Sequence, residues 1–283
     1  MSENIILIPV YNDWKSLNKL LLEIENKSNP NNITKILVVN DCSTEKTKLK
    51  ISKLTKIKEI KILSLNQNLG SQKAIAVGLD YLKKLNKKNF ITIMDGDGED
   101  DPNEINRMLL LARKNINHIV TSNRKQRNEN LFIQVCYKIH LIISFFLTWK
   151  WISFGNFSCF HVDNLKNIKL NEVWCAFPSA VLKKTNIKRL YATRNKRYFD
   201  SSKVNFLKLI EHSLRVNSVF YEKVLTNSFI YMFLIWFFSI KFSILLYSLI
   251  LLINLTIIFI KFKYDVKIPI DYKTFKKNIK KIV

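Results

Sequence analysis

The sequence predicts an α/β protein with a mostly parallel sheet, helices on both faces, and a C-terminal membrane helical hairpin. Three observations predict this class. Short apolar runs alternate with segments of helical periodicity through the first 125 residues, as they do in parallel sheets. Polar clusters directly follow the predicted strands, at the end of a parallel sheet where ligands bind. Finally, Lys241 is the only charged residue between Val224 and Ile260.

Five strands and three helices are predicted in the first 125 residues. The strands are residues 4–10, 35–41, 60–66, 89–95 and 118–124, and the helices are residues 16–25, 72–85 and 105–114. The strand runs are continuously apolar, which is typical of strands covered on both faces. The aromatic-rich region from 131 to 160 is long enough for an amphipathic helix, and both a core position and a place in the lipid head-group layer fit it.

The polar clusters that follow the strands are predicted to share one pocket. They are Tyr11-Asn12-Asp13, Asn40-Asp41, Asn66-Gln67-Asn68 and Asp95-Gly96-Asp97. Because ligands bind beyond the carboxyl ends of parallel strands, four such loops together favour a binding site more strongly than any one of them.

The chain is strongly basic, with 46 Lys and Arg against 22 Asp and Glu and a formal net charge of +24. Solvated surface lysines and attraction to anionic lipids or phosphorylated substrates both fit this excess. Nucleic acid is not an expected partner, since no zinc-finger spacing or RNA-recognition signature is present. The four cysteines lack metal or redox spacing and are expected to be reduced. No signal peptide is visible, so the N-terminus is expected in the cytoplasm.

The apolar segment from Val224 to Ile260 is too long for one membrane span. As a single helix its 37 residues would extend about 55 Å, against a hydrocarbon core of about 30 Å. A division around residues 240–242 gives two segments near the minimum spanning length. The following tail has eight lysines and two acids, which places it in the cytoplasm. We therefore expect a two-helix membrane hairpin at 221–262, spanning or re-entrant, and a basic cytoplasmic tail at 263–283.

The stretch IMDGDGEDDPNE at 93–104 concentrates acids in a basic chain. Five of the seven residues from Asp95 to Asp101 are acidic, so the loop needs a positive partner. The carboxylates of Asp95 and Asp97 suit Mg²⁺ or Mn²⁺, with Glu99 as a further oxygen ligand. An EF-hand is excluded because its twelfth position would be Asn106. Asp100 and Asp101 precede Pro102 and a helix, where helix capping is the first interpretation and a catalytic base the second.

Several motifs, in this order and at this spacing, resemble the donor half of family 2 glycosyltransferases. They are IPVYND, VVNDCST, NQNLGSQKAIAVGLDYL and IMDGDGEDDPNEI. Downstream, SNRKQR, FGNFSCF and RNKRYFDSSKVNFLKLIEHSLRVNSVF resemble the membrane-linked branch of dolichyl-phosphate mannose synthase and bacterial undecaprenyl-phosphate sugar transferases. The resemblance implies a GT-A-like (Rossmann-related) fold over residues 1–220, with a donor half at about 1–125 and an acceptor half at about 126–220. It also implies an inverting, metal-dependent transferase.

The resemblance assigns roles to individual residues. Donor binding falls to Pro9, Tyr11, Asp13, Asp41, Asn68 and Gly70; catalysis to Asp95, Asp97, Arg124 and Arg197; metal binding to Asp95, Asp97 and Glu99; and the acceptor phosphate to Arg127, Asn156, Ser202 and Lys203. The sequence departs from the family pattern at three places. Asp200 stands in place of a glycine, Asn40 and Cys42 in place of the commoner Asp and Gly, and Asn156 where Asp is often found.

The expected function is transfer of one sugar from a UDP- or GDP-linked donor to a membrane polyprenyl phosphate, at the cytoplasmic face of the inner or plasma membrane. A lipid phosphate is already anionic at neutral pH and needs no strong general base, which suits a chain with four scattered histidines. The alternatives are a hydroxyl acceptor on a glycolipid or polysaccharide, with Asp100 or Asp101 as base, and a non-catalytic membrane scaffold. Paired hairpins would also allow a homo-oligomer.

Overall fold

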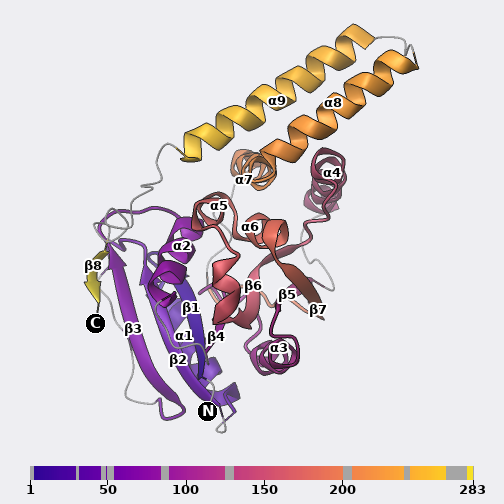
Figure 1. Cartoon of the computed structure of the whole chain (residues 1–283). Coiled ribbons are helices and arrows are strands. Elements are labelled where there is room, and N and C mark those ends of the chain that lie inside the picture. The colour runs from indigo at the N-terminus through magenta and orange to yellow at the C-terminus, as the bar shows by residue number, and fades with distance from the viewer. Residues whose placement is uncertain are drawn as a thin grey trace.

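The computed structural model describes residues 3–29, 32–45, 49, 54–83, 89–124, 131–199, 206–238, 243–265 and 279–282. These residues form one eight-stranded sheet in the order β7-β5-β6-β4-β1-β2-β3-β8, from which two long helices extend (Figure 1). The strands are β1 (Glu3–Val10), β2 (Ile33–Asn40), β3 (Ile57–Leu65), β4 (Phe90–Ile93), β5 (His118–Arg124), β6 (Phe154–His161), β7 (Asn186–Ala192) and β8 (Ile279–Ile282).

Six strands run in the same direction, and β6 and β8 run against them. β1 pairs parallel with β2 and β4, β2 with β3, and β5 with β7. β6 lies between β4 and β5 and is antiparallel to both, and β8 pairs antiparallel with the edge of β3. The predicted mostly parallel α/β sheet is therefore confirmed, and the five strands expected from the sequence are β1 to β5.

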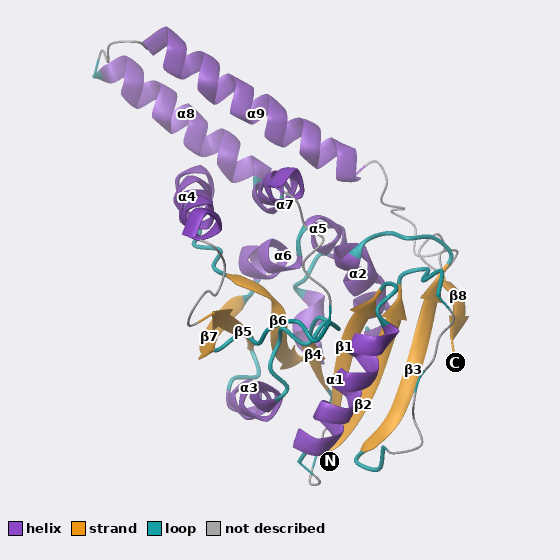
Figure 2. Ribbon diagram, turned by 180° about the vertical axis from the view of Figure 1, so that it is seen from behind, coloured by secondary structure: helices purple, strands orange, loops and turns teal. Residues whose placement is uncertain are grey.

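Helices cover both faces of the sheet. On one face lie α1 (Trp14–Lys27) and α3 (Asn103–Lys114), whose apolar sides pack on alternate residues of β1, β2 and β4. Figure 2 shows α1 over the face of the sheet that Figure 1 turns away. On the other face lie α2 (Ser71–Leu82), η1 (Val162–Lys166), α5 (Leu170–Cys175) and α6 (Phe177–Lys184). This two-sided packing explains why the strand sequences are continuously apolar.

The aromatic-rich region at 131–160 is only partly helical. Its first part forms α4 (Leu131–Thr148), but Phe154–His161 forms β6 in the centre of the sheet. A helix over the whole region is therefore wrong. Trp149 has a positive φ of 51°, a conformation that interrupts a helix. Beyond it, pairing with β4 and β5 determines the strand, and such long-range pairing overrides local preference.

The C-terminal helices form a hairpin that projects from the sheet. α7 (Phe206–Ser218) leads into α8 (Tyr221–Phe237), which runs beside α9 (Ser243–Asp265) in both views (Figures 1 and 2). α8 is about 25 Å long and α9 about 34 Å. Within the described residues, only the segment Ser243–Tyr264 is long and apolar enough to cross a membrane, with a mean hydropathy of 2.5. This observation supports one candidate span rather than two.

Candidate functional site

The four polar loops predicted to share a pocket lie at the carboxyl ends of the parallel strands. Two of them are joined directly, since the backbone N–H of Asp41 donates to the carbonyl of Val10 (2.8 Å). Asn12, which has a positive φ of 49°, receives the N–H of Thr44 on its Oδ1 (2.8 Å), and its own N–H donates to Ser43 Oγ (3.0 Å). The sequence analysis placed Asn12 in a predicted pocket cluster but assigned no role to Ser43 or Thr44. Their reciprocal bonds fix the shape of the predicted nucleotide side.

Asp41 is buried and connects the second polar loop to the third. Its two carboxylate oxygens accept the backbone N–H groups of Leu69 and Gly70, each at 2.7 Å. Burial raises the pKa of Asp41, while the two N–H groups and the charge of Lys73 act in the opposite direction. Gly70 has a φ of +87°, which only glycine adopts readily. The carboxylate thus holds the loop that leads into α2.

Cys42 stands where relatives commonly have glycine, and its backbone explains that preference. Its φ is +59°, in the left-handed region that disfavours residues with a Cβ. Pro9 lies near the end of β1, and Tyr11 beyond it is 47% exposed. Asp13 instead caps α1, since its Oδ1 accepts the N–H of Ser16 at 3.2 Å. The predicted donor residues therefore gather at one edge of the sheet, with Asp13 occupied in capping.

The acidic turn after β4 is held by bonds within itself. The N–H of Asp95 donates to Oδ2 of Asp100 (3.0 Å), and the N–H of Glu99 donates to Oδ1 of Asp97 (3.0 Å). Between them, Gly98 has a φ of +84°. Asp101 accepts the N–H of Asn103 on its Oδ1 (2.9 Å) at the start of α3. Asp101 thus accepts the first N–H of α3 from one residue before the N-cap, which is Pro102 and has no side-chain cap hydrogen bond. Asp100 braces the turn rather than the helix.

A basic segment, Thr193–Tyr198, lies along the acidic turn. Its backbone donates twice to the turn, from Asn195 to the carbonyl of Glu99 (2.9 Å) and from Tyr198 to that of Asp97 (3.1 Å). Within it, the Arg197 guanidinium pairs with Asp97 (2.7 Å) and with Glu99 (3.4 Å). Arg194 also pairs with Glu99. The concentrated negative charge is therefore met by arginines of the same chain.

Arg194 is a site residue that the sequence analysis missed. Burial lowers the pKa of its guanidinium, and the nearby carboxylates of Asp95 and Asp97 oppose that effect. Only its position in the basic run RNKR beside the predicted Arg197 could have drawn attention to it. The two arginines together give the site the charge and the planar donors that bind phosphate oxygens.

A small cavity of about 30 Å³ lies beside the acidic turn. Its lining comes from β5, β6, the end of β7, the acidic turn and the basic segment, namely Asp95, Glu99, Asp100, Asp101, Ser122, Gly155, Asn156, Phe157, Ala192, Thr193 and Arg194. Within it, Asn156 Nδ2 donates to Oδ1 of Asp95 (3.1 Å). Asn156, expected near an acceptor phosphate, thus lies directly against the predicted metal ligand.

The acidic turn offers ligands that suit Mg²⁺ or Mn²⁺. Asp95 and Asp97 present hard carboxylate oxygens on one turn, the type that both ions prefer. In the part of the chain that is described, no group of three or more His, Cys, Asp or Glu side chains is arranged to hold a metal. The two carboxylates of Asp95 and Asp97 fit such a cation.

Some predicted residues have no described side chain. Arg124 ends β5, but only its backbone is described. Arg127, Ser202 and Lys203, together with Asp200, lie outside the described residues.

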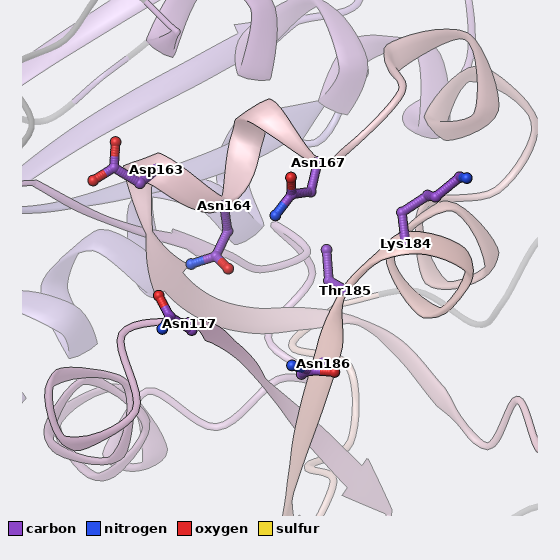
Figure 3. Close-up of a pocket in the computed structure, with 7 residues that line it drawn as sticks. All are labelled: Asn117, Asp163, Asn164, Asn167, Lys184, Thr185 and Asn186. Carbon is purple, nitrogen blue, oxygen red and sulfur yellow. The ribbon is translucent and has the colours of Figure 1, made fainter.

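A larger cavity of about 220 Å³ lies at the opposite edge of the sheet (Figure 3). Its polar lining includes Asn117, which directly precedes β5, and Asn186, which begins β7. Because β5 and β7 are parallel, this cavity is at their amino ends, away from the acidic turn. Volume alone does not identify the site, whereas the position of the polar loops does.

The sheet, the polar loops at its carboxyl end and the acidic turn define a GT-A-like α/β fold. Residues 5–187, more than half of the chain, match the family model for glycosyl transferase family 2. The chain therefore belongs to glycosyl transferase family 2.

Two relatives match parts of the sequence. An uncharacterized glycosyltransferase of Synechocystis sp. is 30% identical over 126 residues, which cover 44% of this chain and 38% of that protein. An uncharacterized protein of Methanocaldococcus jannaschii is 29% identical over 107 residues, covering 37% of this chain and 44% of that protein. The chain thus matches less than half of the length of either relative.

Two solved structures share the fold. A mycobacterial protein aligns with a TM-score of 0.55 at 12% identity, covering 79% of this chain and 75% of that one. S. aureus TarS 1–349, solved in complex with UDP-GlcNAc, aligns with a TM-score of 0.50 at 18% identity, covering 77% and 66%. At these identities the likeness shows the fold.

Proposed function

We propose that this chain transfers a single sugar from a nucleotide-sugar donor to a polyprenyl phosphate, at the cytoplasmic face of the inner or plasma membrane. The observation that carries the proposal is the acidic turn at the carboxyl end of the sheet, where two arginines meet Asp97 and Glu99. A nucleoside diphosphate needs this combination, since carboxylates hold its cation and arginines pair with its phosphate oxygens.

In this proposal the donor lies across the polar loops. The exposed ring of Tyr11 stacks on the base, and the loop braced by Asp41 covers the nucleoside. The diphosphate reaches Asp95 and Asp97, and Mg²⁺ or Mn²⁺ supplies positive charge that stabilises the departing diphosphate. Arg197 and Arg194 exchange carboxylate partners for phosphate oxygens as the donor binds.

The transfer step needs no proton acceptor in this arrangement. An ionised acceptor oxygen forms a bond to the anomeric carbon while the bond from that carbon to the β-phosphate oxygen breaks. The bonding electrons leave on the nucleoside diphosphate, and the configuration at the carbon inverts. Asp100 and Asp101 are already hydrogen-bonded to backbone N–H groups of the turn and of α3, which favours a phosphate acceptor over a hydroxyl.

An exposed apolar surface supports a lipid-linked acceptor. On α8 and α9, large side chains face outward, with Phe229 at 73%, Trp236 at 68% and Ile244 at 82% exposure. On the neighbouring α4 side, Trp149 is 53% exposed, and its indole N–H donates to the hydroxyl of Tyr231 on α8 (2.9 Å). Apolar patches of this extent mark membrane or protein contacts, and tryptophans favour the head-group layer. We infer that α4 and the hairpin contact the bilayer.

Calorimetry in detergent tests the donor site. We expect UDP or GDP to bind the wild type only with Mn²⁺ present, and Asp97→Ala to lose this metal-dependent binding. Asp163→Ala is the matched control, because Asp163 is an acid of the larger cavity that pairs with Lys166, far from the acidic turn. Absence of binding by a folded wild type to either nucleotide would overturn the proposal and favour a non-catalytic scaffold.

The acceptor is tested separately with the donor that binds. A transfer assay compares a polyprenyl phosphate with the matching polyprenol, which differs only in the phosphate. Transfer to the phosphate alone is expected. Transfer to the polyprenol or to a glycolipid hydroxyl would instead identify the second candidate, a hydroxyl-directed transferase with Asp100 or Asp101 as base.

A further inference from the structure

Two side-chain amides, one buried and one half-buried, connect the backbone of α6 to the acidic turn. Gln72 is the second residue of α2, and Asn156 lies in β6. The N–H of Phe177 donates to Gln72 Oε1 (2.6 Å), Gln72 Nε2 donates to Asn156 Oδ1 (3.0 Å), and Asn156 Nδ2 donates to Asp95 Oδ1 (3.1 Å). We call Gln72 and Asn156 the amide relay. Phe177 and Gln72 are 105 positions apart in the sequence, and Gln72 and Asn156 are 84 positions apart.

The direction of every bond in the amide relay is fixed from its ends. A backbone N–H can only donate, so Gln72 must turn its oxygen toward Phe177 and its NH₂ group toward Asn156. Asn156 must therefore offer its oxygen to Gln72, which leaves its NH₂ group for Asp95. An ionised carboxylate can only accept, so the last bond agrees with the first. Reversal of either amide would place two acceptors or two donors together.

Burial of Gln72 and Phe177 keeps water from replacing the hydrogen bond between them. Gln72 is 7% exposed and Phe177 is fully buried. Phe177 begins α6, and no side chain of the preceding residues caps this helix, so Gln72 supplies that acceptor from α2. A buried N–H without a partner is destabilising, and this favours the observed orientation of Gln72.

We propose that Gln72 and Asn156 are positioning residues that set the Asp95 carboxylate for the metal–diphosphate. This inference rests on the proposed donor site and extends it to two residues outside the acidic turn. The side chain of Asp95 is held by Asn156 while its backbone N–H is held by Asp100. Both the main chain and the carboxylate are therefore oriented before a cation binds. Hydrogen-bonding partners behind metal ligands commonly tune metal affinity in this way.

Gln72→Met tests the amide relay, because it keeps the length of the side chain and removes both of its hydrogen bonds. In the presence of saturating UDP or GDP, we expect the Kd for Mn²⁺ to rise at least about tenfold, the lower end for such partners. Electron paramagnetic resonance of free Mn²⁺ measures this Kd without catalysis. Asn164→Leu is the matched control, since Asn164 is a buried amide that donates to two carbonyls near the larger cavity.

Two further variants separate positioning from stability. Gln72→Glu still accepts the Phe177 N–H but cannot donate when ionised, so Asn156 must turn an oxygen toward Asp95 and Mn²⁺ affinity should also fall. If Gln72→Met fails to fold, Gln72→Glu carries the test. Asn156→Ala combined with Gln72→Met should weaken Mn²⁺ binding no more than Asn156→Ala alone, because both act through one bond to Asp95.

The outcomes distinguish this inference from the proposed function. Wild-type Mn²⁺ affinity in Gln72→Met or Gln72→Glu, with metal-dependent nucleotide binding intact in the wild type, would overturn the amide relay alone. An equal loss in Asn164→Leu would also overturn it, because the effect would then follow general destabilisation. No metal-dependent nucleotide binding by the folded wild type would overturn both proposals.

Discussion

Replacement of Gly98 by alanine tests whether the basic segment and the acidic turn act as one unit. Gly98 has a φ of +84°, and a Cβ there would lie 2.3–2.4 Å from three ring atoms of Tyr198. The left-handed backbone costs an alanine about 1 kcal/mol. The ring must also move, which breaks the 3.1 Å bond from the Tyr198 N–H to Asp97 and costs about another 1 kcal/mol.

A local loss of about 2 kcal/mol corresponds to roughly 25-fold weaker binding of metal–nucleotide, because every 1.4 kcal/mol is a factor of ten. Calorimetry with UDP or GDP and Mn²⁺ measures this effect. Gly155→Ala is the control, since Gly155 lines the same small cavity and has no positive φ. A Cβ at Gly155 would lie more than 4 Å from any heavy atom beyond its two chain neighbours. Equal nucleotide affinity in the two variants would refute the coupling of the turn to the basic segment.

Three other substitutions have defined outcomes. Gly78→Ala would place its Cβ 2.4 Å from Leu7 Cδ1 in the core and should lower the free energy of unfolding by about 1–3 kcal/mol in urea denaturation, with nucleotide affinity unchanged. Burial alone would raise the pKa of Glu25, but three backbone N–H groups and a hydroxyl lower it to about 2. The ionised Glu25 stabilises the fold by roughly 1–2 kcal/mol after solvent screening. This stabilisation is present above pH 4.5 and is lost as the pH falls toward 2. In Glu25→Gln, the free energy of unfolding should therefore fall less than in the wild type when the pH is lowered across that range. Asp41→Asn leaves one of the two part-buried N–H groups, of Leu69 or Gly70, facing an NH₂ group. Thermal unfolding should show a loss of about 1 kcal/mol, and an unchanged melting temperature would contradict that role.

The donor half was predictable because its elements depend on local patterns. The apolar runs and helical periodicities before residue 125 locate β1 to β5 and α1 to α3 within a few residues. β6 was not predictable in the same way, since the aromatic-rich region continues from α4 into FGNFSCFH, which forms a strand by pairing with β4 and β5. Hydrophobic periodicity is a local pattern and does not predict the pairing of β4 with β6, which lie more than 60 residues apart in the chain.

Some residues of the candidate site were likewise predictable from a local motif, and others were not. Asp95 and Asp97 are separated in the sequence only by Gly96, so a short local motif is enough to find them. The contributions of Gln72 and Arg194 arise only when α2 and the basic segment approach the turn from distant parts of the chain. Polar residues whose role depends on a partner elsewhere leave no local pattern, and Asn156 was recognised only through the family resemblance.

The last strand gives the hairpin a second attachment to the catalytic body. α8 leaves the sheet domain through α7, and the chain beyond α9 returns as β8 to cover the outer edge of β3. The hairpin is therefore joined to the sheet domain on both sides, through α7 before it and through β8 after it. If α9 enters the bilayer, this geometry sets the height of the acidic turn above the lipid surface. Under the proposed function, a lipid phosphate at that height would meet the donor bound at the acidic turn. β8 also closes the β3 edge to pairing with another chain.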